Sequence, residues 1–387
     1  MPKILHVTTV PASLLFLRGQ PALMRARGVE IVVATAPGEA LERFAEEEGV
    51  RAHAVPMARK ITPAEDLATL ARLWQIIQRE RPDVVHAHTP KGGLLGTLAA
   101  LLAGVPVRIY HMRGLPLVGL EGARRALLTL TERVSCAAAT HVVAVSHGLR
   151  RDALRFELCA PDKLRVLGHG SGQGVDVARF DPERLAPDTR SRVRAAADLP
   201  EGATVVGYVG RLVNDKGVRE LAAAWRRLRA AHPDVHLVIV GAFEERDRVP
   251  ADVRSTLEDD PRVHLLGFRR DLPELYAAMD VVVLPSYREG FPNVPLEAAA
   301  MRLPIVGTHV TGMDEAIDDQ LTGLLVPPRD ARSREAAIER YLVDPELRAR
   351  HGRAGRERVT AKFARADVLG HLSRFYREVA PSLERLG

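Results

Sequence analysis

The stretch LPSYREGFPNVPLEAAAMRLPIV, residues 284–306, is the most informative part of the chain. It predicts a buried strand that ends at Pro285 and a helix that begins near Val294–Pro295, since proline is well tolerated in a first helical turn. The loop amides and the helix start form a positive end suited to a diphosphate. Glu289 and Glu297 are separated by seven residues, so both carboxylates can face a ligand at that end.

The same alternation of strand and helix extends outward along the chain. Short β-branched runs predict strands, and segments such as Pro63–Arg79 carry apolar residues at helical spacing. Alternating strands and helices predict parallel sheets covered by helices on both faces. The expected fold is therefore α/β, with two Rossmann-like domains facing across a cleft. The predicted strands are 4–8, 31–35, 52–55, 84–87, 107–111, 142–145, 164–167, 205–209, 235–240, 263–266, 281–285, 305–307 and 324–326.

A break in this alternation suggests where the domains meet. The charged, proline-punctuated stretch 181–201 predicts a linker between an N-terminal domain, 1–180, and a C-terminal domain, 202–363. The last helical segment, within 364–387, is free to pack on the second domain or to cross back to the first. Both possibilities stay open from the sequence.

Composition limits the possible functions. The 387 residues predict two or three domains, and an aromatic content of 4% argues against stacking on single-stranded nucleic acid, so no nucleic-acid partner is expected. Because the chain has only two cysteines, it cannot depend on a framework of disulfides, and this composition is typical of a protein in the reducing cytoplasm. The apolar run 94–107 is too short to span a bilayer. The net charge of +6 divides into +7 for residues 1–180 and −1 for 181–387.

A second segment, VVGYVGRLVNDKG at 205–217, resembles a phosphate clamp. Its strand is expected to end at Gly210, where a glycine allows close backbone approach. Arg211 and Lys216 follow, and a guanidinium with an ammonium at a strand end can bind phosphate oxygens.

Taken together, VGRLVNDKG and SYREGFPNVPLEA resemble the retaining family 4 glycosyltransferases of the GT-B fold, with Glu289 and Glu297 matching their E-x7-E pattern. The resemblance covers nearly the whole chain and is closest to subgroups that assemble capsule, exopolysaccharide, O-antigen or other lipid-linked glycans. Further matching segments are HTPKGGLLG (88–96), YHMRGLP (110–116), VVAVSHGLRR (142–151) and GVDVARF (174–180).

The resemblance implies that 1–180 is an acceptor-binding domain and 202–363 a nucleotide-sugar-binding domain, and it implies roles for individual residues. Arg211 and Lys216 would neutralise the nucleotide diphosphate, Glu289 would contact hydroxyls of the transferred sugar, and Glu297 would contact the ribose. His111 would face the donor sugar near the reacting carbon, and these positions with their neighbours form the predicted site. The catalytic set is His111, Arg211, Lys216 and Glu289; the donor-binding set is Gly210, Arg211, Lys216, Glu289, Gly290, Phe291, Asn293 and Glu297; the acceptor side is His88, Lys91 and Ser13.

The implied reaction is transfer from a UDP-sugar, an N-acetylhexosamine or hexose, to a polyprenyl-diphosphate-linked glycan. The protein is expected in the cytoplasm, attached to the inner face of the plasma membrane, with anionic lipid as a partner. The basic clusters that would face the lipid are Arg59-Lys60, Arg124-Arg125 and Arg150-Arg151.

No cofactor and no metal are expected, because no Asp-x-Asp stands at a strand end and the pair His86 and His88 lacks a third ligand at a diagnostic spacing. The glycines at 168, 170, 172 and 174 do not have dinucleotide-binding spacing, which argues against a dehydrogenase. Many family members carry a glycine pair after the first strand, whereas this chain has proline, alanine and serine at 11–13. A UDP-sugar 2-epimerase of the same architecture is the alternative function.

Overall fold

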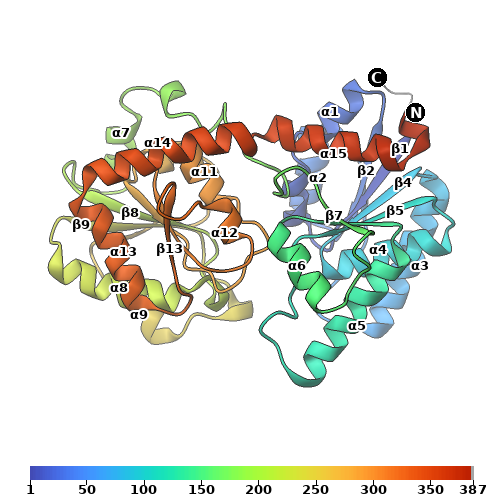
Figure 1. Ribbon diagram of the computed structural model, residues 1–387, viewed down its shortest axis with the longest axis horizontal. Coiled ribbons are helices and arrows are strands. Elements are labelled where there is room, and N and C mark those ends of the chain that lie inside the picture. Colours follow the sequence, from blue (N-terminus) through green and yellow to red (C-terminus); the bar gives the residue numbers. More distant parts are fainter. Residues whose placement is uncertain (385–387) are drawn as a thin grey trace. The chain divides into compact units, whose positions relative to one another are not determined.

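The computed structural model describes residues 1–384, which form two compact units (Figure 1). Unit 1 comprises Met1–Gln173 together with the chain from Ala366 onward, and unit 2 comprises Gly174–Arg365. Each unit contains a parallel sheet with helices on both faces, so the predicted α/β class with two Rossmann-like domains is confirmed.

The sheet of unit 1 has seven strands in the order β3-β2-β1-β4-β5-β6-β7. The strands are β1 (Lys3–Val7), β2 (Glu30–Thr35), β3 (Arg51–Ala54), β4 (Val84–His88), β5 (Val107–Met112), β6 (His141–Ala144) and β7 (Leu164–Val166). The helices are η1 (Pro11–Leu17), α1 (Gln20–Ala26), α2 (Glu39–Glu48), α3 (Pro63–Glu80), α4 (Pro90–Leu102), α5 (Gly122–Ala138), α6 (His147–Arg155), α15 (Arg365–Val379) and α16 (Pro381–Glu384).

Two apolar layers cover this sheet. On one face Leu73 of α3 and Ala99 of α4 pack against β1, β2 and β4. On the other face α1, α2 and the returning helix α15 pack together, with Leu372 and Phe375 of α15 in the same buried cluster as Ile4 of β1. The C-terminal helix therefore completes the core of unit 1, which was one of the two possibilities that the sequence left open.

Unit 2 repeats the architecture with six strands in the order β10-β9-β8-β11-β12-β13. The strands are β8 (Thr204–Val209), β9 (Val235–Val240), β10 (Val263–Leu265), β11 (Val281–Val283), β12 (Ile305–Thr308) and β13 (Gly323–Val326). The helices are η2 (Pro182–Arg184), α7 (Thr189–Ala196), η3 (Asn214–Lys216), α8 (Val218–Ala231), η4 (Glu245–Asp247), α9 (Ala251–Glu258), α10 (Leu272–Ala277), α11 (Val294–Ala300), α12 (Met313–Ala316), α13 (Ala331–Val343) and α14 (Pro345–Lys362).

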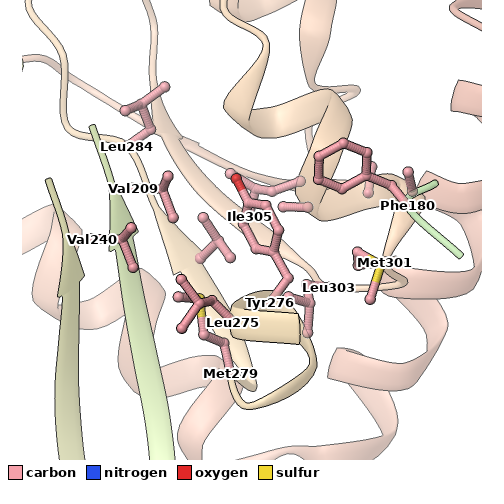
Figure 2. Close-up of a cluster of buried hydrophobic side chains, with 14 of the residues drawn as sticks. Phe180, Val209, Val240, Leu275, Tyr276, Met279, Leu284, Met301, Leu303 and Ile305 are labelled. Carbon is pink, nitrogen blue, oxygen red and sulfur yellow. The ribbon is translucent and has the colours of Figure 1, made fainter. Parts of the chain in front are cut away.

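One apolar cluster of unit 2 lies beside the loops that carry the predicted donor site. Figure 2 shows Tyr276 of α10 among aliphatic side chains from the strands and from the turn that follows α11. Tyr276 and Ile305 are almost completely buried. At about 25 cal/mol per Å² of apolar surface, such a cluster holds α10 and α11 firmly against the sheet.

The segment 181–201 is not the linker that the sequence predicts. It contains η2 and α7, and Val193 packs in the same apolar cluster as Tyr276. The buried Arg194 explains the error, because its guanidinium donates to the carbonyls of Ala203 and Ala278 and pairs with Asp280 at 2.9 Å. The boundary between the units falls earlier, between Gln173 and Gly174, so the N-terminal domain is shorter than 1–180.

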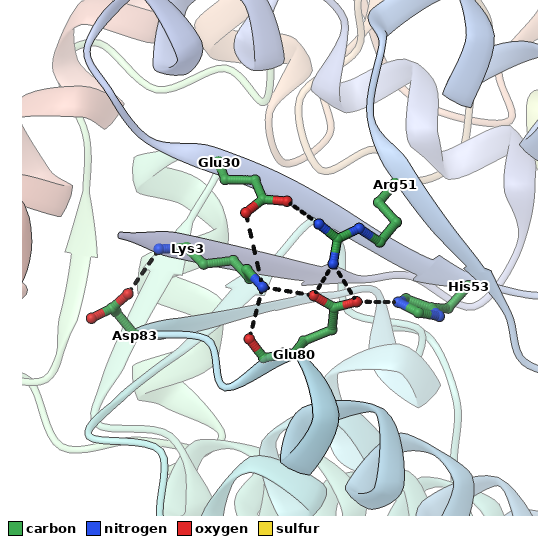
Figure 3. A network of polar contacts seen from close by, with 6 residues as sticks. All are labelled: Lys3, Glu30, Arg51, His53, Glu80 and Asp83. Carbon is green, nitrogen blue, oxygen red and sulfur yellow. Dashed lines mark hydrogen bonds and ion pairs between the residues drawn. The ribbon is translucent and has the colours of Figure 1, made fainter. Parts of the chain in front are cut away.

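A charged cluster ties strands β1 and β3 of unit 1 to the end of helix α3, on the side where the strands begin. The carboxylate of Glu80, at the end of α3, forms ion pairs with Lys3 at 2.8 Å and Arg51 at 2.7 Å and a hydrogen bond with His53 at 2.9 Å. Figure 3 shows these residues. Burial opposes ionisation of Glu80, but the hydrogen bonds from Lys3, His53 and Arg51 outweigh it and lower the pKa of this carboxyl to about 2.

We expect Glu80→Gln to lower the free energy of unfolding of unit 1 by about 3 kcal/mol at neutral pH, since a pKa difference of one unit corresponds to about 1.4 kcal/mol. The contribution of this carboxylate is present above pH 4.5 and disappears as the pH falls toward 2. Hydrogen exchange of the β1 and β4 amides measures the effect in unit 1. Glu39→Gln is the matched control, because the exposed pair of Glu39 with Arg43 should contribute less than about 0.5 kcal/mol.

A second buried carboxyl, Glu132 of α5, makes stability depend on pH in the opposite direction. Tyr110 donates a hydrogen bond of 2.7 Å to Glu132, and burial raises the pKa of this carboxyl to about 7 against the opposing effect of that bond. The folded state therefore binds the proton more tightly than the unfolded state, so stability falls as the pH rises from about 4.5 to 7.

We expect Glu132→Gln to remove this dependence. Between pH 5 and pH 8, the unchanged protein should lose about 2.5 kcal/mol of unfolding free energy relative to the variant. Urea unfolding of both proteins at the two pH values measures the difference. A gap between the two proteins that stays constant with pH would show that Glu132 is already ionised in the folded state at pH 5.

Candidate active site

The direction in which the chain winds through the sheet of unit 2 reverses at one point. β8 and β11 are neighbours, while the chain from β8 leads to β9 on one side and the chain from β11 leads to β12 on the other. In open parallel sheets, ligands bind beyond the carboxyl ends of the strands at such a switch point. The loops that leave β8 and β11 are 210–217 and 284–293, the two segments that the sequence singled out.

The structure brings these two loops into contact. The amide of Tyr287 donates to the carbonyl of Asp215 at 2.9 Å, and Arg288 pairs with Asp215 at 3.4 Å. Gly217 has a left-handed φ of 68°, and a Cβ placed there would lie 2.0 Å from the carbonyl oxygen of Pro285. Only glycine permits this approach, so the loops are held at a fixed separation.

Within this pair of loops, the predicted cations face carboxylates. Lys216 Nζ forms an ion pair with Glu289, and both side chains are largely buried. Arg211 pairs with Glu244 at 3.0 Å and is half-exposed. Each cation that would neutralise a diphosphate is therefore balanced by a carboxylate in this structure, and a bound diphosphate could take the place of that carboxylate.

Of the other donor-side residues, Gly210 directly follows β8, whereas Gly290, Phe291 and Asn293 lie just before α11. Gly210, with φ of 153°, donates its amide to Val240, and Asn293 precedes the helix without a side-chain capping bond. Gly290 closely approaches Gly312, and the ring of Phe291 lies 5.3 Å from that of Phe363. The structure thus places the donor set Gly210, Arg211, Lys216, Glu289, Gly290, Phe291, Asn293 and Glu297 in one unit on these two loops and α11.

Glu297 differs from Glu289 in its surroundings. It lies in the first turn of α11 and accepts a hydrogen bond of 3.1 Å from Tyr276. Burial raises the pKa of Glu297, and the bond from Tyr276 partly offsets this effect. The two glutamates are therefore not equivalent, since Glu289 is paired with a cation and Glu297 with a neutral hydroxyl.

Unit 1 has its own switch point between β1 and β4, and histidines gather there. The strand register pairs His6 with His86 and His88 with His111, all on one face of the sheet. All four rings are buried. His111 Nδ1 lies 3.1 Å from His86 Nε2, whereas His111 Nε2 has no hydrogen-bond partner in the described chain.

Burial keeps these histidines neutral. It lowers the pKa of His6 to about 3 and the pKa values of His86, His88 and His111 well below 6.5, with the nearby Arg113 cation adding to the effect in each case. Their stabilising contribution is present above about pH 6.5 and is lost in acid, since the unfolded chain then binds the protons.

Three of these rings form the geometry closest to a metal site. His6, His86 and His88 each bring one nitrogen within 4.8 Å of the others. Their ring nitrogens already have partners, and the rings of His86 and His88 stack at 4.2 Å between centroids rather than converging on a point. Arg113 also lies 3.2 Å from His88 Nδ1, and its positive charge opposes a cation at this place.

The acceptor-side predictions fall at the same edge of unit 1. His88 ends β4, and Lys91 lies in the first turn of α4 but is tied to Asp66 of α3 at 2.7 Å. Ser13 is buried in η1, the helix that follows β1. The structure brings His88 and His111 together, while the ammonium of Lys91 binds α3.

The predicted site residues do not include Arg113, Gln20 and Tyr376, which also contribute to this edge. Arg113 donates to His88 and to the carbonyl of Gly172, where any Cβ would lie 2.3 Å from the guanidinium. Two residues from different helices, Gln20 and Tyr376, bond to the histidines. The alternation of His86 and His88 could have indicated a shared face that includes His6, but no spacing rule could have indicated Tyr376, which lies 290 residues beyond His86.

No helix in the described residues 1–384 is both long enough and apolar enough to cross a membrane.

Comparison with known proteins gives a family match for each of the two units. Residues 17–170 match the family described as "Glycosyl transferase 4-like domain", and residues 203–344 match "Glycosyl transferases group 1". The capsular polysaccharide biosynthesis glycosyltransferase CapM of Staphylococcus aureus is 32% identical over 374 residues, which are 97% of this chain and 96% of that protein. The Escherichia coli UDP-Gal:alpha-D-GlcNAc-diphosphoundecaprenol alpha-1,3-galactosyltransferase is 29% identical over 308 residues, covering 78% and 77% of the two chains.

Solved structures show the same fold. Anabaena HepE in complex with UDP superimposes with a TM-score of 0.80 at 20% identity, covering 98% of this chain and 100% of that one. WaaG, a glycosyltransferase involved in lipopolysaccharide biosynthesis, gives 0.72 at 16% identity, covering 95% and 97%. Fold and site thus define a glycosyltransferase of the GT-B class. The chain belongs to the family 4 glycosyltransferases.

Proposed function

We propose that the protein transfers a hexose or N-acetylhexosamine from a UDP-sugar to a polyprenyl-diphosphate-linked glycan, with retention of configuration, during synthesis of a bacterial cell-surface polysaccharide. The observation that carries this proposal is the Lys216–Glu289 pair at the switch point of unit 2. The names of the capsular and diphosphoundecaprenol-dependent relatives support the pathway and the acceptor. The HepE complexes with UDP and with UDP-glucose support the donor class.

The chemistry follows from the leaving group. When the bond from the anomeric carbon to the phosphate oxygen breaks, negative charge develops on the diphosphate, and preorganised cations stabilise it without a strong acid. Lys216 and Arg211 supply that charge. Glu289, released from Lys216, accepts hydrogen bonds from sugar hydroxyls, and Glu297 accepts bonds from the ribose. The acceptor hydroxyl attacks from the face that the diphosphate leaves, and the departing phosphate takes its proton.

The proposed reaction needs no metal, because these side chains neutralise the diphosphate. Transfer should therefore persist in excess EDTA. Loss of activity with EDTA and its recovery on adding a divalent cation would contradict this part of the proposal.

The proposal is tested with a panel of UDP-sugars and a polyprenyl-diphosphate-linked GlcNAc acceptor, with UDP release and the product followed together. We expect UDP release that depends on acceptor and a product with the anomeric configuration of the donor by NMR. Conversion of UDP-GlcNAc to its manno isomer without acceptor would instead identify the epimerase, and an inverted product would refute retention.

We further propose that unit 1 binds the inner face of the plasma membrane through α5. The first turns of α5 are exposed, with Arg124 and Arg125 beside the exposed Leu127 and Leu130. A shallow depression of about 410 Å³ lies along the same helix, lined by Arg125, Leu130 and Arg133 among others. Arginines with neighbouring leucines suit an anionic lipid surface. Arg150 donates instead to the carbonyl of Leu164, which favours α5 over the cluster at 150–151.

The α5 proposal predicts that a variant with both Arg124→Glu and Arg125→Glu binds anionic vesicles at least 10-fold more weakly, since each basic residue near such a surface contributes about 1 kcal/mol. Co-sedimentation with phosphatidylglycerol vesicles measures the change. The matched control carries Arg226→Glu and Arg227→Glu on α8 of unit 2. Vesicle binding that does not change with salt concentration, with lipid charge or with the α5 substitutions would refute the proposal.

A further inference from the structure

Seven buried or half-buried side chains of unit 1 form one continuous series of contacts at hydrogen-bond distance, which we call the histidine chain. It begins at a guanidinium and ends at a ring nitrogen that has no hydrogen-bond partner among the described residues. In order, its members are Arg113, His88, His6, Gln20, Tyr376, His86 and His111.

The contacts of the first half run from Arg113 to Gln20. Arg113 Nε lies 3.2 Å from His88 Nδ1, His88 Nε2 lies 2.8 Å from His6 Nδ1, and His6 Nε2 lies 3.1 Å from the terminal amide of Gln20. The side chain of Arg113 is further held over the ring of Phe16, 4.2 Å from its centroid.

The second half runs from the same amide atom of Gln20 to His111. That atom lies 3.0 Å from the Tyr376 hydroxyl, which lies 2.5 Å from His86 Nδ1. His86 Nε2 then lies 3.1 Å from His111 Nδ1. Because a single atom of Gln20 serves both halves, its identity as oxygen or nitrogen decides the direction of every bond in the chain.

Each of the four histidines is neutral, since burial holds its pKa below the physiological range. A neutral imidazole has one donor nitrogen and one acceptor nitrogen. Once one nitrogen of a ring is known to be the donor or the acceptor, the other nitrogen has the opposite role. That role in turn fixes the role of the nitrogen that it contacts on the next residue.

Arg113 sets the direction, because a guanidinium has donors and no acceptor. It must donate to His88 Nδ1, so His88 carries its proton on Nε2 and donates to His6 Nδ1. His6 then carries its proton on Nε2 and donates to Gln20. The atom of Gln20 at this position must accept, and is therefore Oε1.

The structure records the nitrogen Nε2 of Gln20 in that place, but this orientation of the amide creates a conflict. Gln20 would donate to His6 Nε2, His6 would donate to His88 Nε2, and His88 would carry its proton on Nδ1. Two hydrogens would then face each other across the 3.2 Å between His88 Nδ1 and Arg113 Nε. Since the two ends of a carboxamide are nearly alike in shape, the hydrogen-bond network decides between them, and here it selects the oxygen.

The second half follows from the same oxygen. Tyr376 must donate its single proton to Gln20 Oε1, so its oxygen accepts from His86 Nδ1. His86 Nε2 then accepts from His111 Nδ1. This leaves His111 Nε2 with a lone pair and no hydrogen.

We propose that Arg113, acting through the histidine chain, holds His111 in the tautomer whose Nε2 is a hydrogen-bond acceptor, and that Gln20 and Tyr376 are the positioning residues that transmit this choice. His111 Nε2 would therefore accept from a hydroxyl of the substrate and would not bind a phosphate oxygen. The link to a sugar hydroxyl rests on the proposed glycosyl transfer. The proposal also gives α15 a role beyond packing, because this helix supplies Tyr376 to the histidine chain.

The test is NMR of the full chain labelled with ¹⁵N in the histidine rings, with long-range correlations that distinguish protonated from unprotonated nitrogens. His111→Asn and His86→Asn assign the resonances. We expect His111 Nε2 and His86 Nε2 to be unprotonated, and His6 Nε2 and His88 Nε2 to be protonated. A protonated His111 Nε2 in the unchanged protein would overturn the inference even if the protein is an active transferase.

Tyr376→Phe adds a functional readout. It removes the acceptor of His86 Nδ1, so a measurable fraction of His111 should become protonated at Nε2 while His6 keeps its tautomer. We expect kcat for transfer to fall about 10-fold or more, with stabilisation by UDP unchanged because the diphosphate contacts lie in unit 2. Tyr341→Phe is the matched control, since it removes a buried hydroxyl that lies 2.7 Å from His351 in unit 2.

The possible failures can be told apart. The expected tautomers together with an absence of transfer to any acceptor would leave the histidine chain standing and refute the proposed function. Transfer with unchanged His111 tautomer and kcat in both Tyr376→Phe and Gln20→Leu would refute the positioning role alone. Because the NMR of the unchanged protein is decisive by itself, a variant that fails to fold does not remove the test.

Discussion

Replacing Lys216 with alanine is expected to lower kcat/KM for sugar transfer by about 10²–10³-fold, the range observed when one preorganised group that stabilises developing charge is removed. Lys216 is held in place by η3 and by the tight approach of Gly217 to Pro285, so its ammonium needs little rearrangement to meet a diphosphate. The loss should be large because the variant also leaves Glu289 without its cation, close to the place where negative charge develops.

The measurement is steady-state UDP release with acceptor present, alongside the shift in melting temperature produced by UDP. Both should decrease in the variant. Arg192→Ala on α7 is the control, since it removes an exposed positive charge from the same unit away from the switch point. Equal losses of activity in Lys216→Ala and Arg192→Ala would indicate a general effect of charge. Full activity of Lys216→Ala would show that Lys216 is not part of the donor site.

Replacing Glu289 should separate donor binding from transfer. Glu289→Ala frees Lys216 from its ion pair, so UDP itself should bind at least as tightly as before. Transfer should nevertheless fall about 10–100-fold, because a hydrogen bond to a charged group contributes about 1.5–3 kcal/mol and the sugar hydroxyls lose that partner. Lys216→Ala weakens both steps, whereas Glu289→Ala weakens only one.

Calorimetric titration with UDP and with a UDP-sugar measures the two binding steps, and initial rates measure transfer. The double variant completes a thermodynamic cycle, in which the two residues should couple because they contact each other. Weaker binding of UDP to Glu289→Ala would contradict the idea that the carboxylate occupies the place of the diphosphate. Glu244→Ala serves as a comparison, since it frees Arg211 in the same way.

Much of the fold could be predicted because parallel strands buried on both faces are nearly continuous apolar runs. The strand at 281–283 and its neighbours stand out from their flanking loops for this reason. The prediction of a linker at 181–201 is wrong because charged residues and prolines are typical of linkers. Arg194 is instead an interior residue whose guanidinium donates hydrogen bonds to buried carbonyls. Composition cannot reveal that kind of burial.

The donor loops could be found from sequence because each one is local, with its glycines, cations and glutamates on the stretch of chain that directly follows a strand end. The histidine chain could not. Its partners Gln20 and Tyr376 come from α1 and α15, and only the return of the C-terminal helix to unit 1 brings them together. The ion pair of Lys216 with Glu289 was also not foreseen, although both residues were predicted, because spacing gives no information on pairing between two loops.

The central claim is that the loops after β8 and β11 form the donor site of a UDP-sugar glycosyltransferase. Calorimetric titration of UDP into the unchanged protein and into Lys216→Ala tests it most directly. We predict that UDP binds the unchanged protein at a single site and binds the variant at least 10-fold more weakly, while Arg192→Ala behaves as the unchanged protein does. The absence of UDP binding, or equal binding by the unchanged protein and Lys216→Ala, would contradict the claim.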